Sequence, residues 1–90
     1  MGIRITEVEI IPLKPRNGLI AIASCLYCGQ LALNSIAIYS RPDGSSYRLV
    51  YPTKVLANGK EIHIFYPINK RTGDAITRAI VRKYEELMKK

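Results

Sequence analysis

The sequence is poor in the residues that metal sites and many active sites require. Its 90 residues include no tryptophan, a single histidine, His63, and two cysteines, Cys25 and Cys28. A structural zinc site takes four ligands, mostly Cys and His, and three such residues do not supply them. Catalysis by a nucleophile and a base needs groups that act together, and one histidine with seven scattered acids suggests no such set. We therefore expect no metal, no cofactor and no enzymatic activity.

The two cysteines have the Cys-x-x-Cys spacing of redox and metal motifs. The surrounding segment, LIAIASCLYC, has the pattern of a strand, in which residues three apart point to opposite faces. We expect the thiols of Cys25 and Cys28 to diverge and to serve as small packing side chains.

Long apolar runs are also missing. No segment approaches the roughly 18 apolar residues of a membrane span, and the opening MGIRITEVEI lacks the apolar centre of a secretory signal. We expect a cytoplasmic protein with no membrane span. The length suits one domain over residues 1–90.

Acidic residues are scarce relative to basic ones. Fourteen Lys and Arg stand against seven Asp and Glu, for a net charge of +7, and +4 of this lies from Lys70 onward. Such an excess favours anionic partners such as nucleic acid. The alternative at this stage is a solvated basic surface that has no partner.

Residues up to Ile68 are rich in β-branched and aromatic side chains, interrupted by turn signals. Pro12 and Pro15 are expected to end the first strand, and the pairs Asn17-Gly18, Asp43-Gly44 and Asn58-Gly59 mark turns or connections. Five strands are expected, at about 3–12, 19–28, 31–40, 47–51 and 61–66.

A helix is expected after the strands, at about residues 70–88, with the sheet occupying 3–68. The predicted fold class is α+β, with an about five-stranded antiparallel meander sheet followed by one carboxy-terminal amphipathic helix. Asn69 or Thr72 is expected to cap this helix. Gly73 is a poor helix former and favours a start near Asp74, which would then lie in the first turn.

The central strands predict a second copy of the chain. The segments LIAIASCLYC and LALNSIAIY are apolar at both odd and even positions, so both faces of the sheet require cover. One helix covers one face of five strands. We therefore expect a homodimer, formed through a sheet face or by strand exchange.

On the expected helix, apolar and basic residues take opposite sides. At 100° per residue, Ile76, Ile80 and Leu87 share one arc. Four basic residues fall on a line opposite to it: Arg71, Arg78, Arg82 and Lys89. This line is long enough to follow a nucleic-acid backbone or to lie along a major groove.

The second half of the sequence contains a series of short motifs. The segment YPTKVLANGKEIHIFYPIN has a Pro-Thr-Lys element, a short Asn-Gly connection, a strand, and Pro-Ile-Asn before a helix. These motifs resemble the SpoVG family of stage V sporulation and septation regulators, which shows Met-Pro-Ser-Lys, a Pro-Asp-Gly turn and Ile-Ala-His-Pro-Ile-Asn in the same order. ITEVEI, IAIAS and LNSIAIY resemble its earlier strands, so the resemblance covers nearly the whole chain. It departs at Asn34 and Ser35, at Phe65 and Tyr66, and at Gly73.

The resemblance implies a small dimer with an antiparallel sheet and a terminal helix, which binds DNA and, in some members, RNA in a regulatory role. On this interpretation Arg71 and Arg78 read bases, while Arg82, Lys89 and Lys54 hold phosphate. Lys54 matches a basic position of the family motif and is otherwise an ordinary turn lysine.

Two alternatives to this interpretation remain open. The basic line is either a nucleic-acid contact or a solvated face with local ion pairs. The whole chain is either a nucleic-acid-binding regulator or a non-catalytic protein-interaction module that binds an acidic partner in a cell-division or regulatory assembly. Tyr47 and Tyr51, four residues apart, are the best pair to test for base stacking.

Overall fold

The computed structural model describes residues 2–42 and 46–88. Its strands and helix are, in chain order, β1 (Ile5–Arg16), β2 (Leu19–Tyr27), β3 (Leu31–Ser40), β4 (Tyr47–Val50), β5 (Thr53–Val55), β6 (Glu61–His63) and α1 (Lys70–Met88). The first four strands form one antiparallel sheet in the order β1-β2-β3-β4, and β5 pairs with β6 in a separate antiparallel hairpin. The predicted α+β class and carboxy-terminal helix are confirmed.

The fifth predicted strand does not join the main sheet. Only Glu61–His63 of the expected 61–66 is a strand, and it pairs with β5, which the sequence did not predict. Pro52 follows β4 and has no N–H for a ladder, so the chain leaves the sheet there. The carbonyl of Pro52 instead accepts a hydrogen bond from Ile64 N at 3.0 Å, at the base of the new hairpin.

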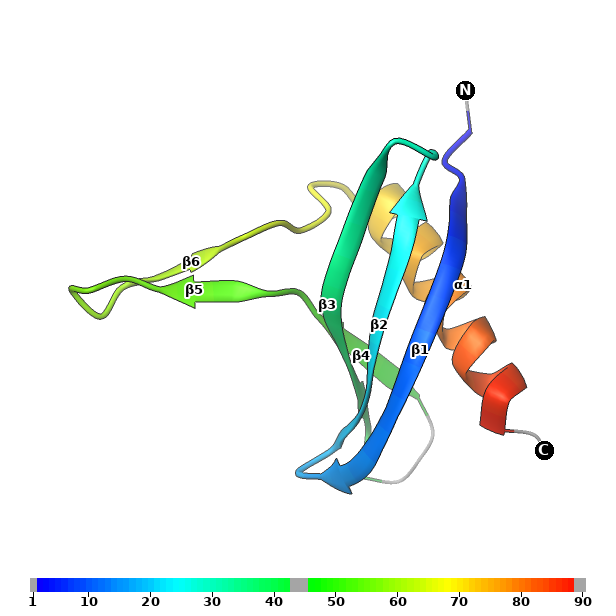
Figure 1. Cartoon of the computed structure of the whole chain (residues 1–90), viewed down its shortest axis with the longest axis horizontal. Helices are drawn as coiled ribbons and strands as arrows, with labels where there is room; N and C mark the ends of the chain where they lie inside the picture. The colour runs from blue at the N-terminus through cyan, green and yellow to red at the C-terminus, as the bar shows by residue number, and fades with distance from the viewer. Residues whose placement is uncertain (1, 43–45, 89–90) are drawn as a thin grey trace.

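The hairpin makes an arm, defined here as residues 52–64, that projects from the sheet (Figure 1). Its tip closes with hydrogen bonds from Gly59 N to the carbonyl of Leu56 and from Lys60 N to Asn58 Oδ1, both at 2.9 Å. Asn58-Gly59 is therefore the turn of the arm.

Strand β1 runs through the two prolines that were expected to end it. Pro12 pairs with Ala21 and Arg16 pairs with Leu19, so the strand continues to residue 16. Strand β1 is an edge strand with only β2 beside it. A proline whose missing N–H faces the outer side of such a strand therefore removes no hydrogen bond between strands. The strand is also irregular, with register shifts after Thr6 and after Pro12 and a positive φ of 51° at Glu7.

Tight turns join the first three strands. Asn17 and Gly18 have φ values of 52° and 89°, as the predicted Asn-Gly hairpin turn requires. Cys28 and Gly29, at 52° and 68°, form the corresponding turn between β2 and β3. The predicted Asp43-Gly44 turn lies outside the described residues.

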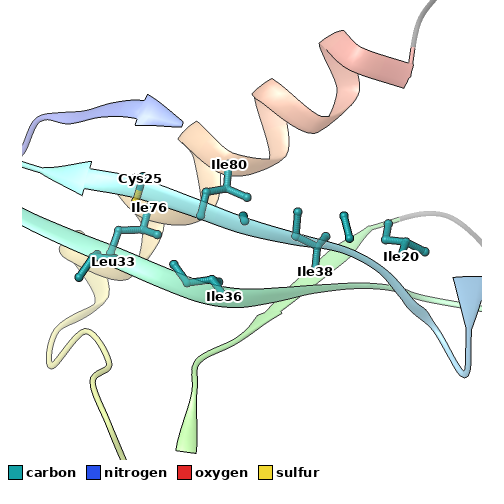
Figure 2. Packing of buried hydrophobic residues seen from close by; sticks show 9 residues of the cluster. Ile20, Cys25, Leu33, Ile36, Ile38, Ile76 and Ile80 are labelled. Carbon is teal, nitrogen blue, oxygen red and sulfur yellow. The ribbon is translucent and has the colours of Figure 1, made fainter. Parts of the chain in front are cut away.

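The core lies between α1 and one face of the sheet (Figure 2). Ile36 and Ile38 of β3 are completely buried, as is Ile80 of α1, and Ile76 is almost so. The other buried members are smaller or lie toward the ends of β2 and β3: Ile20, Ala21, Ala23, Cys25 and Leu33. Burying these side chains supplies most of the driving force for folding.

The opposite face of the sheet carries an apolar row. The strand register aligns Ile11 with Ile22, Ile22 with Ala37, and Ala37 with Val50, one residue from each strand. Helix α1 lies behind the other face, and no described element covers this row (Figure 1). Ile11 remains 62% exposed. The expectation that one helix leaves an apolar sheet face open is thus met.

Helix α1 begins at Lys70, earlier than Gly73 suggested. Asn69 caps it, since Thr72 N donates to Asn69 Oδ1 at 2.8 Å. Gly73 lies within the helix, and a Cβ there would approach Pro67 Cγ to 3.4 Å, so the small residue allows close packing. Among the described residues, no helix is long and apolar enough to cross a membrane.

Candidate nucleic-acid interface

The basic line occupies the side of α1 that faces away from the core. Ile76 and Ile80, one turn apart, fix the buried side of the helix. Arg71, Arg78 and Arg82 are all exposed on the opposite side. Lys89, the fourth member of the predicted line, lies outside the described residues.

These arginines are not neutralised within the described part of the chain. Its one ion pair joins Lys70 Nζ to Asp74 Oδ2 at 2.9 Å, with side chains 88% and 51% exposed. Asp74 therefore lies beyond the first helical turn, contrary to the expected first-turn position, and it pairs with Lys70. Three guanidinium groups thus remain available to an anionic partner.

Shallow hollows border this side of the helix. One, of about 710 Å³, includes Arg71 and Arg78 together with Gly2 and Ile3 at the start of the chain. Another, of about 440 Å³, lies between Arg78 and Arg82 of the helix and Ser46 and Tyr47 of the sheet edge. Arg78 contributes to both, so it is central to the predicted line.

Lys54 lies apart from the helical arginines. It is exposed in the middle of β5, in the arm and not in a turn as predicted. The arm projects from the sheet away from α1 (Figure 1). Within one chain, the structure does not bring Lys54 together with Arg78 and Arg82.

Tyr47 and Tyr51 are committed to packing. The Tyr47 ring meets that of Tyr84 on α1 edge to face at 5.5 Å, and Tyr51 meets Phe65 in the same way at 5.9 Å. Burial raises the pKa of the Tyr51 hydroxyl, and that oxygen has no hydrogen-bond partner in the described residues. These contacts favour a structural role over base stacking.

The two cysteines occupy different environments. Cys25 is buried in the core, while Cys28 is half-buried in the turn after β2. Burial raises the pKa of the Cys25 thiol, which disfavours the reactive thiolate. The described residues contain no group of three or more potential metal-ligating His, Cys, Asp or Glu side chains.

The sequence analysis did not identify two further arginines, Arg41 and Arg48, which lie on the β3–β4 hairpin. The guanidinium of Arg48 lies 5.4 Å from the centre of the Tyr39 ring, and Arg41 Nε donates to Ser46 Oγ at 2.6 Å. Tyr39 and Arg48 are directly paired across the strands. A register assigned to this hairpin from the sequence would have brought the two together.

The similarity of this chain to known proteins is distant. No family model matches the chain. It is similar to a SpoVG protein. The relative is a protein of Treponema denticola named "Putative septation protein SpoVG", which is 28% identical over 82 residues, covering 91% of this chain and 86% of the relative. This similarity agrees with a divergent SpoVG-like chain.

Proposed function

We propose that the chain is a nucleic-acid-binding regulatory protein, related to septation or sporulation control, that binds DNA or RNA through α1 and acts as a homodimer. The observation that carries the proposal is the exposed and unneutralised line of Arg71, Arg78 and Arg82. The similarity to a SpoVG protein supports the regulatory role. Access to nucleic acid in turn requires a cytoplasmic location.

Arginine is well suited to both parts of such a contact. Its planar fork binds phosphate, or the O6 and N7 edge of guanine, through two hydrogen bonds. We assign base contacts to Arg71 and Arg78 and phosphate contacts to Arg82, Lys89 and Lys54. The separation of Lys54 from α1 means that it acts through the second protomer or at a distant part of the same nucleic acid.

A titration of labelled duplex DNA and single-stranded RNA at two salt concentrations tests the proposal. The test variant replaces Arg71, Arg78 and Arg82 with Gln, and the control replaces three exposed cations elsewhere, Arg4, Lys14 and Lys60, so that the net charge is equal. We expect the wild type to bind with a steep salt dependence, on duplex DNA about 0.9 per neutralised phosphate on a log–log plot.

The helix variant should lose binding by about 100-fold or more, while the control should lose much less, since each lost phosphate or base contact costs on the order of 1 kcal/mol or more. Equal losses in the two variants would show that only net charge matters. Failure of the wild type to bind either nucleic acid at low salt would refute the function.

The homodimer is argued from exposed apolar surface. Val55, Ile62 and Ile64 of the arm are 64%, 41% and 59% exposed, and Ile68 beyond it is 86% exposed. A two-stranded hairpin is at best marginally stable by itself in water. We propose that a second copy of the chain packs against this surface, because its own arm offers matching apolar side chains.

Light scattering on a size-exclusion column measures this directly. The wild type should elute at about twice the 10.1 kDa chain mass. Ile62→Asp with Ile64→Asp should give the single-chain mass, and Lys60→Asp, a polar change in the same arm, should leave the dimer intact. A wild type that remains monomeric at micromolar concentration contradicts the dimer.

A further inference from the structure

An open cavity of about 770 Å³ lies at the end of the sheet that holds the β1–β2 turn. Its lining includes Gly18 from that turn, Tyr39 and Arg41 from the end of β3 and the residues after it, and Arg48 from β4. This volume is within the range of sites that hold small organic ligands, about 300–1,000 Å³. None of the residues in the proposed interface on α1 contributes to it.

Two arginines of this cavity are held in place by neutral partners. Arg48 lies over the ring of its cross-strand neighbour Tyr39, and Arg41 Nε is bonded to Ser46 Oγ. A guanidinium that lies over a ring keeps its charge and its N–H groups, and a bond through Nε leaves both terminal nitrogens free. No carboxylate among residues 2–42 and 46–88 lies within ion-pair distance of either arginine.

The cavity is connected to the helix through the edge of the sheet. Ser46, which accepts the bond from Arg41, also lines the hollow that contains Arg78 and Arg82. Strand β4, which follows Ser46, forms one edge of the sheet. Ser46 is therefore shared between the hollow beside Arg78 and Arg82 and the hydrogen bond to Arg41 of the cavity.

We infer that this cavity binds one unpaired nucleotide of the nucleic acid whose backbone lies along α1. Its base stacks on the outer face of the Arg48 guanidinium, and Arg41 holds its phosphate. Bases stack on arginine planes and aromatic rings only when they are free of a duplex, so the protein prefers single-stranded or locally unpaired substrate. The inference rests on the proposed function and adds a second site to it.

Tyr39 is a positioning residue in this arrangement. Its ring supports Arg48 from one side, and the Cδ2 atom lies 3.6 Å from where a Cβ on Gly18 would be. With one side of the guanidinium occupied by the ring, the other side remains for a base. Removal of the ring should therefore weaken the binding of a base without changing the charge of the protein.

The test measures fluorescence anisotropy with a single-stranded RNA of about 12 nucleotides, within the usual site sizes for one such domain, and a blunt RNA duplex of about 12 base pairs, which has no unpaired nucleotide. The cavity variant is Arg41→Gln with Arg48→Gln, and Tyr39→Leu removes the ring alone. The charge-matched control is Arg4→Gln with Lys60→Gln, and the helix variant is Arg78→Gln with Arg82→Gln. Thermal melting verifies that each variant is folded.

We expect the cavity variant to lose about tenfold or more in affinity for the single strand, as loss of a stacked base does, and about threefold or less for the duplex. Tyr39→Leu should show the same selectivity with a smaller loss, and the control should bind like the wild type. The helix variant should lose affinity for both RNAs.

Several results would overturn the inference. If the cavity variant and its control lose affinity equally, or if the cavity variant loses equally for both RNAs, the cavity supplies only charge. Loss in the helix variant alone leaves the proposed function intact and removes this site. If the wild type binds neither RNA, nor duplex DNA in the titration above, the function and the inference both fail.

Discussion

The body of the molecule consists of β1–β4 and α1. The body and the arm both contain β-branched apolar side chains, but they bury these side chains to very different extents. Ile36, Ile38 and Ile80 in the body are 0% exposed, whereas Ile62 and Ile64 in the arm are 41% and 59% exposed. The body has a helix to cover one face of its sheet, and the arm has only two strands of three residues. Strand-forming side chains thus complete a core in one region and remain exposed in the other.

The largest expected difference between the two regions comes from the same substitution made in each. Ile80→Ala removes a fully buried side chain, and we expect it to lower the free energy of unfolding by about 2–5 kcal/mol. Ile62→Ala in the arm should lower it by about 0.5 kcal/mol or less in protein dilute enough to be monomeric.

Urea denaturation followed by circular dichroism measures both changes. Raising the protein concentration should increase the cost of Ile62→Ala if the arm is covered in the dimer. Comparable losses for the two variants in dilute protein would mean that the arm is part of the folding unit of the body.

Turn glycines give the next largest effect. Gly18 in the body and Gly59 in the arm both have positive φ, at 89° and 85°, so alanine is strained at either. A Cβ at Gly18 would also approach the carbonyl oxygen of Ser40 to 3.3 Å, while at Gly59 nothing lies within 4 Å. We expect Gly18→Ala to cost about 1–2 kcal/mol in unfolding free energy, from the left-handed backbone and the close contact.

Gly59→Ala should act on the arm alone. It should speed amide hydrogen exchange in β5 and β6 and leave the global unfolding midpoint unchanged, because a small unit with few buried contacts opens locally. A shift in the midpoint as large as that of Gly18→Ala would contradict independent opening of the arm.

A smaller effect is expected at the helix cap, where the chain re-enters the body after the arm. Asn69→Ala removes the acceptor for Thr72 N and should destabilise the body by about 1 kcal/mol. Thr72→Ala, which removes the alternative cap considered from the sequence, should cost less. Thermal melting of the two variants decides between them, and a greater loss for Thr72→Ala would argue against the cap described here.

The smallest effect is expected from the hydrogen bond between the two arm strands. Thr53 Oγ1 donates to Glu61 Oε2 at 2.9 Å, and both residues are exposed. Thr53→Val keeps the side-chain shape and the strand preference but removes the donor. We expect a change of about 0.5 kcal/mol or less, visible in NMR signals of the arm and absent from those of α1. A change that spread to α1 would show that arm and body are coupled.

The body was largely predictable from the sequence because its signals are local. Asn17-Gly18 fixes the first hairpin, and the spacing of Ile76 and Ile80 fixes the buried side of the helix. The extension of β1 past Pro12 and Pro15 was not predictable, since it depends on the strand lying at an edge, which only the assembled sheet defines. The arm was missed for a similar reason, because a three-residue strand has little pattern and its pairing is set by the partner strand.

The candidate site, too, was only partly predictable from the sequence. Helical periodicity alone places Arg71, Arg78 and Arg82 on one side of α1, and the structure agrees with that placement. Arg48 was not identified, because its position over Tyr39 depends on strand register. Lys54 was grouped with the helix by motif, whereas the structure places it on the arm.

The two prolines in β1 have a consequence for strand addition at the edge of the sheet. A sheet with unblocked edges can add strands from further molecules without limit, which leads to fibres and aggregates. Pro12, Pro15 and the irregular backbone at Glu7 disrupt the outer edge of β1, and the opposite edge is formed by only four residues of β4. Neither edge offers a long regular template, so open-ended addition of strands at the edges of this sheet is disfavoured.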